Sequence, residues 1–109
     1  MKDDLNTVTL SGTLSLDPET YTMVDMPVTH LRVIVHGAGP NGAGNATLHV
    51  IAYDKVAEHA REFRSGDRVV LTGPLRQSRD RWTQALSTEI EAKVLIKMRP
   101  HLLEHAAKE

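Results

Sequence analysis

Three arginines surround the only tryptophan of the chain in the segment RQSRDRW, residues 76–82. A nucleobase can stack on an indole ring, and guanidinium groups neutralise phosphates. Trp82 with Arg76, Arg79 and Arg81 therefore predicts a nucleic-acid-binding hairpin. Two alternatives stay open. Trp82 can be a buried residue at the rim of the core, and the arginines can form a solvated hairpin that Asp80 partly neutralises.

A second group of candidates follows from strand alternation. Residues 28–36 and 47–53 alternate as strands do. One face of each strand is mainly apolar, and the other face carries side chains that can meet water or a ligand. Arg32 and Lys55 are weaker cationic candidates for the same side. The histidines among these positions can stack on bases, although a satisfied or solvated strand histidine is more common; they are His30, His36 and His49.

Two motifs match catalytic or cofactor patterns without the context that the chemistry needs. Residues 37–42 spell GxGxxG, but a strand and not a helix is expected after them, which favours a loop over a nucleotide site. Residues 101–105 spell HxxEH, but on a short terminal helix without a third ligand. No serine stands in a nucleophile-elbow context, and there is no cysteine. We therefore expect no enzyme activity, no metal and no cofactor.

Length and charge set broad limits. A chain of 109 residues with a net charge of −1 is typical of one globular domain. Residues 1–54 are acidic in balance and residues 55–109 are basic, so a local positive surface is possible. No signal peptide or membrane-spanning stretch is readable, so a cytoplasmic location is the expectation.

The elements that must position these residues are mainly strands. Alternation predicts five, at residues 6–16, 28–36, 47–53, 68–75 and 88–96, and residues 19–27 are irregular or a weak edge strand. Gly12 predicts a bulge or a bend. A helix is expected between the third and fourth strands, with Asp54 as its N-cap, Gly66 after its end, and one apolar stripe, made of Val56, Ala57, Ala60 and Phe63.

This order predicts an all-β fold, a five-stranded Greek-key OB-fold barrel with one helix between strands three and four. An SH3-like barrel is the nearest rival, but it lacks a helix of this length at this point. We expect the barrel to occupy residues 1–99. A short C-terminal helix would then follow Pro100, in a tail of residues 100–109.

Several short stretches resemble the bacterial single-stranded DNA-binding protein family, in the same order and over residues 6–98. They are NTVTLSG at 6–12, DPE at 17–19, KVAE at 55–58, RSGDRVVLTG at 64–73, LR at 75–76, Trp82 and TEI at 88–90. Each is weak alone, and their order and spacing make the resemblance fairly specific.

The resemblance implies a homodimeric or homotetrameric OB-fold protein that holds single-stranded DNA without sequence preference in replication, recombination or repair. It implies stacking roles for Tyr53 and Trp82, with arginine and lysine contacts to phosphates. Replication or recombination proteins are then possible partners, and no membrane is involved.

The chain departs from the family pattern in two respects. Thr47 stands where the family usually has an aromatic residue, and the loop GAGPNGAGN lacks another. The chain also ends in HAAKE, without the acidic tail of the family's replication hubs, as a tailless or truncated member would. It also resembles primosomal replication protein N, although that protein lacks this helix motif. A DNA-binding-deficient OB-fold module that docks on a replication protein is the alternative function.

Overall fold

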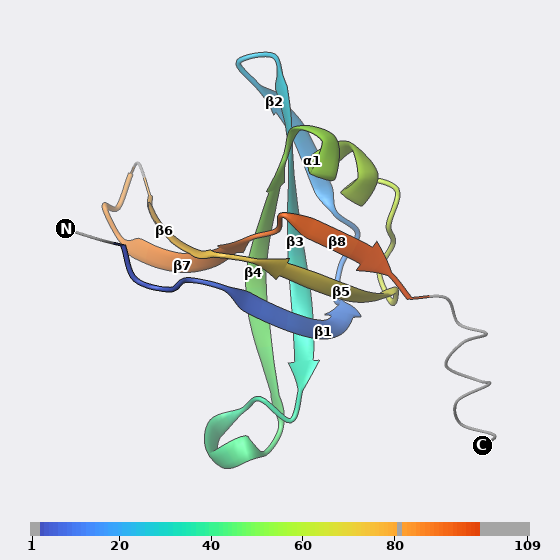
Figure 1. Ribbon diagram of the computed structural model, residues 1–109, viewed down its shortest axis with the longest axis vertical. Coiled ribbons are helices and arrows are strands. Elements are labelled where there is room, and N and C mark those ends of the chain that lie inside the picture. The colour runs from blue at the N-terminus through green and yellow to red at the C-terminus, as the bar shows by residue number, and fades with distance from the viewer. Residues whose placement is uncertain (1–2, 81, 99–109) are drawn as a thin grey trace.

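The computed structural model describes residues 3–80 and 82–98, which form a strongly curled, mainly antiparallel sheet with one α-helix (Figure 1). The eight strands of this part of the chain are β1 (Val8–Leu14), β2 (Glu19–Met23), β3 (Met26–His36), β4 (Asn45–Tyr53), β5 (Arg68–Gly73), β6 (Leu75–Arg79), β7 (Leu86–Glu91) and β8 (Val94–Lys97). The helix α1 (Asp54–Ala60) lies between β4 and β5, and the 3-10 helix η1 (Pro40–Gly42) lies between β3 and β4.

The sheet has the strand order β6-β7-β4-β3-β1-β5-β8, with β2 added to β3. All pairs are antiparallel except β4 with β7, which is parallel. Strand β1 curls the sheet because residues 8–13 pair with β5, whereas residues 13–14 pair with β3. Gly12 lies at this bend, where a Cβ atom would stand 2.5 Å from the backbone oxygen of Ile34. The bend predicted at Gly12 is therefore confirmed, and its cause is a close backbone approach.

The core lies inside the curl, and α1 closes one end of it. Ala60 and Phe63 belong to the main buried cluster together with Leu14, Val33 and Leu71, and Val56 packs against that cluster. Thr29 is fully buried on β3 and donates a 2.9 Å hydrogen bond to the carbonyl oxygen of Ala57. A buried hydroxyl must be paired, so this bond fixes the helix against β3.

The predicted strand count is wrong, because eight strands replace five. Residues 19–23 form a full edge strand. Pro74 separates β5 from β6, since proline cannot donate to a strand ladder. The last predicted strand divides at residues 92–93 into β7 and β8, which pair with β4 and β5 respectively. The mostly β character and the helix after β4 are as predicted.

The helix is shorter than its apolar stripe suggests, and its cap is different. Tyr53 and not Asp54 is the N-cap, and Asp54 lies inside the first turn with a φ of 55°. The α-helix ends at Ala60, where the Phe63 amide bonds the Ala60 carbonyl and the Arg64 amide bonds Oδ2 of Asp67. These local bonds replace the next helical turn. The C-terminal helix predicted after Pro100 falls outside the described residues.

Candidate nucleic-acid interface

The first part of the candidate site is the outer side of the β2-β3-β4 sheet, which we call the sheet face and define by Tyr21, His30, Arg32, His49 and Tyr53. The register of β3 and β4 places Arg32 directly opposite His49, and both are exposed. The alternate residues of both strands, such as Leu31 and Val50, are buried. The sequence-predicted residues Arg32, His49 and Tyr53 therefore lie on one face of the sheet, where Arg32 and His49 are exposed and Tyr53 is partly buried.

Tyr21 of the sheet face was not predicted as a binding residue, and His30 was named only among the histidines that can stack on bases. Tyr21 of β2 stacks on His30 of β3 with ring centroids 5.5 Å apart and an interplanar angle of 21°. The Tyr21 hydroxyl and His30 Nε2 are also hydrogen-bonded at 2.9 Å. The available signal was the alternation of Glu19, Tyr21 and Met23, which marks one side of a strand.

Tyr53 connects the sheet face to the β6–β7 hairpin. Partial burial raises the pKa of its phenol, the carboxylates of Glu89 and Glu91 raise it further, and Arg76 opposes them. The hairpin reaches Tyr53 because β7 pairs with the end of β4, with Ile51 opposite Glu91. The phenol thus stays neutral at physiological pH, beside the cation of Arg76, and offers an uncharged ring for stacking.

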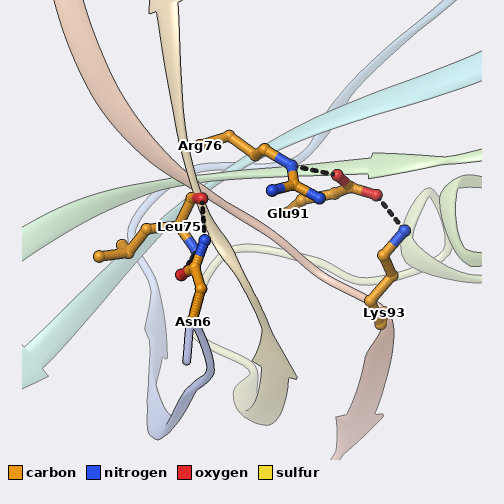
Figure 2. Close-up of polar contacts among 5 residues, drawn as sticks. All are labelled: Asn6, Leu75, Arg76, Glu91 and Lys93. Atoms are coloured by element: carbon orange, nitrogen blue, oxygen red, sulfur yellow. Dashed lines mark hydrogen bonds and ion pairs between the residues drawn. The ribbon is translucent and has the colours of Figure 1, made fainter. Parts of the chain in front are cut away.

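A network of ion pairs holds the base of the hairpin (Figure 2). The guanidinium Nε of Arg76 donates to Glu91 at 3.1 Å, and Lys93 pairs with the other oxygen of the same carboxylate. The hydrogen bond from Lys93, followed by that from Arg76, lowers the pKa of Glu91 below its ordinary value. Glu91 therefore stays charged at neutral pH, and its stabilising contribution disappears only as the pH falls through its lowered pKa.

The same network limits what Arg76 can do. Arg76 was predicted to contact phosphates, and its side chain is 54% exposed, but its charge is already partly balanced by Glu91. A phosphate must compete with this carboxylate for the guanidinium group.

Asn6 ties the N-terminal segment to the start of β6. Its amide side chain forms two hydrogen bonds with the backbone of Leu75, at 3.0 and 2.8 Å (Figure 2).

The resemblance seen in the sequence implies binding of single-stranded DNA, and on that expectation replacing Glu91 by glutamine should strengthen the binding. The change frees Arg76 and Lys93 for phosphates, so the slope of log K against log salt should steepen by about one. Salt-dependent titration with a labelled oligonucleotide measures this effect. Glu62→Gln, an equal charge change at an exposed residue after α1, is the control. An equal gain in both variants would contradict a specific role for Glu91.

Trp82 lies at the tip of the hairpin and is 85% exposed. The interpretation of Trp82 as a buried rim residue is therefore wrong. Its backbone amide and that of Thr83 both donate to Oδ1 of Asp80 at 2.8 Å, and these two bonds lower the pKa of Asp80. This turn holds the tip, because an aspartate that bonds amides two and three residues ahead is a common turn former.

The arginines of the hairpin do not form one cluster. Arg76 and Arg79 lie three positions apart on β6, so their side chains leave opposite faces of the strand. Arg79 donates to the carbonyl oxygen of Gln84 at 3.2 Å, across the hairpin tip. Arg81 lies outside the described residues. Figure 1 shows the β6–β7 hairpin extending away from the crossing of β4 and β5.

The other predicted features lie apart from this surface or are ordinary loops. Lys55 is exposed on the first turn of α1 and not on the sheet. His36 pairs with Oδ1 of Asn45 at 3.1 Å, next to the loop between β3 and β4. That loop contains the GxGxxG match, and it leads through η1 into β4 as predicted. The HxxEH segment falls outside the described residues.

Two further features are absent from the described residues. Residues 3–80 and 82–98 contain no group of three or more histidine or carboxylate side chains placed to hold a metal ion. In the same part of the chain, no helix is long and apolar enough to cross a membrane.

The fold is similar to that of solved bacterial proteins. The structure of the wild-type single-stranded DNA binding protein from Thermus aquaticus matches 87% of this chain with a TM-score of 0.72 and 30% sequence identity. A deletion mutant of the same protein matches with a TM-score of 0.72 and 29% identity. This chain spans 41% and 42% of the lengths of those two chains. No protein-family model and no curated protein matches the sequence.

These matches agree with two expectations from the sequence. Both solved chains are named for binding and not for catalysis, as expected for a protein that is not an enzyme. The matched region covers most of the chain, as the short stretches of resemblance do. The predicted resemblance is therefore confirmed, in that 87% of the chain has a fold similar to that of a solved bacterial single-stranded DNA binding protein.

Proposed function

We propose that this protein binds single-stranded DNA without strong sequence preference, by stacking bases on its rings and contacting phosphates with its arginines. The observation that carries the proposal is where the chain places its few aromatic residues. Phe63 is buried in the core, whereas Tyr21, Tyr53 and Trp82 lie on the sheet face or at the hairpin tip. The similarity to proteins named for this activity supports the proposal further.

The geometry suggests a path for the strand from the sheet face to the hairpin. Bases would stack on the Tyr21–His30 pair and on Tyr53, and the next bases would reach Trp82. Arg32 and His49 would meet the backbone at the middle of the sheet face, and Arg76 would meet it at the base of the hairpin, whereas Arg79 offers a cation on the other face of β6. Arg81 and Lys55 are additional candidates for phosphate contacts. The Tyr21–His30 pair offers ring surface that compensates for the missing aromatic residue at Thr47.

A titration with oligo-dT tests the proposal, with the fluorescence of Trp82 as the signal. Stacking on the exposed indole should quench the fluorescence, and the affinity should fall as salt rises because phosphate neutralisation releases counterions. The measurement is repeated at two salt concentrations. If neither quenching nor a mobility shift occurs at low salt, the protein is better described as an OB-fold module that docks on a replication protein.

The proposal includes a role in replication, recombination or repair as a homodimer or homotetramer. In the described residues, β8 is an end strand of the sheet, and its Val94 and Ile96 are 49% and 55% exposed. Apolar residues on an open strand edge support association with another chain. Sedimentation velocity of the full chain measures the oligomeric state, and a purely monomeric protein would contradict this part of the proposal.

A further inference from the structure

The sheet face contains a small cavity beside β3. Its volume is about 250 Å³, and it lies between the segment Leu16 to Glu19 and the outer side of β3. The backbone amide of Ser15 donates to the carbonyl oxygen of Arg32 at 3.0 Å, so this segment begins beside β3. Sites for drug-sized ligands usually hold about 300–1,000 Å³. The cavity is below that range and suits a single planar ring.

One wall of the cavity is a ring surface. Tyr21 and His30 both line it, and their stacking and hydrogen bond hold the two rings in fixed positions. Tyr21 is 46% exposed, and Leu16 adds an apolar side chain that is 54% exposed. A planar aromatic ligand can therefore enter from solvent and stack without first ordering the protein side chains.

A second wall carries hydrogen-bond acceptors. Glu19 lines the cavity and lies directly opposite His30 in the β2–β3 register. Asp17 also lines it, and Oδ1 of Asp17 accepts a 2.8 Å hydrogen bond from the Ser65 amide, which fixes the Asp17 carboxylate. Ionised carboxylates only accept hydrogen bonds. They match the exocyclic amine of cytosine, adenine or guanine and repel the O4 acceptor of thymine. The cavity thus differs from a sequence-blind stacking platform.

The lining of the cavity also includes a cation, the guanidinium group of Arg32. Arg32 and His49 both line the cavity and stand opposite each other on β3 and β4. A guanidinium group in this lining can hold the phosphate of the same nucleotide whose base enters. This arrangement offsets the repulsion between the two carboxylates and the DNA backbone, so one nucleotide is met by rings, acceptors and a cation together.

We propose that this cavity takes one base of the bound strand and prefers a base with an exocyclic amine, cytosine fitting best because it is the only pyrimidine among the three amino bases of DNA. The inference rests on the proposed function, since it adds base discrimination to single-stranded DNA binding. Glu19 is the specificity residue, Tyr21 is the stacking residue, and Arg32 is the phosphate contact.

Competition between oligo-dC and oligo-dT of equal length tests the proposal on the full chain. In Glu19→Gln, the amide can also donate to thymine O4, so the ratio of dC affinity to dT affinity should fall by about fivefold. Glu62→Gln makes the same charge change away from the cavity and should leave the ratio as in the unmodified protein. Tyr21→Leu should weaken both oligonucleotides by about fivefold or more through lost stacking.

The outcomes separate this inference from the proposed function. An equal ratio in Glu19→Gln and in the unmodified protein, with binding intact, would overturn the base preference alone. Unchanged affinities in Tyr21→Leu, with a native circular dichroism spectrum, would overturn the stacking wall. No binding of either oligonucleotide by the unmodified protein would overturn both the proposed function and the cavity assignment.

Discussion

The double substitution Trp82→Ala and Tyr53→Ala is expected to weaken the binding of oligo-dT by at least about thirtyfold. Each base stacked on an aromatic side chain contributes about 1–3 kcal/mol, so removing two platforms costs roughly 2 kcal/mol at the least. Trp82 is 85% exposed and Tyr53 only partly buried, so neither change empties the core. The fold should therefore persist.

Because the double variant lacks the intrinsic reporter, the anisotropy of a labelled oligonucleotide is the right measurement. Leu86→Ala is the matched control, since Leu86 is a large apolar residue of the same hairpin and is 52% exposed. The control should bind within about twofold of the unmodified protein, because a general loss of exposed apolar surface carries little energy. An unaltered affinity in the double variant would reject both residues as stacking platforms and leave the fold untouched.

The single variants add information on the path of the strand. Tyr53 lies where the sheet face meets the hairpin base, close enough for Arg76 and Glu91 to affect its phenol. Trp82 lies at the tip of that hairpin. If the strand runs continuously between them, the two single losses should add, since distant sites behave independently. If only one of the two single substitutions weakens binding, the DNA strand contacts either the sheet face or the hairpin tip and not both.

The strands of the sheet face could be predicted because their signal is local. One side of β3 and β4 is buried, so apolar residues recur at every second position, and a shift by one residue would bury Arg32 and His49. The same alternation places those two residues on one face. The register that puts Arg32 directly opposite His49 depends on both strands together. Alternation within each strand does not fix this register, but it excludes the registers that would bury polar residues.

The hairpin was predicted less well because its decisive contacts are not local. The sequence shows a dense run of arginines, but Glu91, which balances Arg76, lies fifteen residues away. Lys93 forms an ion pair with the same carboxylate, because β7 ends at Glu91 and the chain turns there toward β8. Because side chains alternate along a strand, Arg76 and Arg79 also lie on opposite faces of β6. The density of charge in a segment thus predicts a basic element and does not predict which cation is available.

The strand breaks have a related cause. Residues 68–75 and 88–96 each look like one strand, and both divide where they cross. At the crossing, the Glu91 amide bonds the Pro74 carbonyl at 2.9 Å and the Lys93 amide bonds the Thr72 carbonyl at 2.9 Å. Gly73 lies between these two bonds. Only a residue without a side chain fits there, which the sequence shows merely as a glycine before a proline.

Gly73→Ala is accordingly expected to destabilise the protein by about 3 kcal/mol or more, because overpacking against a backbone that cannot yield is costly. A Cβ atom at this position would stand 1.8 Å from the Glu91 carbonyl oxygen and 3.1 Å from the Lys93 amide nitrogen. Relief requires the crossing chains to separate, which breaks the paired bonds on both sides. Urea unfolding followed by far-ultraviolet circular dichroism measures the loss.

Gly44→Ala is the matched control. Gly44 has a φ of 72° with nothing within 4 Å of an added Cβ, so the change introduces only backbone strain, of about 1 kcal/mol. A loss in Gly73→Ala no greater than in Gly44→Ala would show that the crossing is looser than described. The greater loss has a functional consequence as well. Separation at Gly73 displaces Glu91, releases Arg76 and tilts the hairpin, so surviving folded protein should bind DNA with a changed salt dependence.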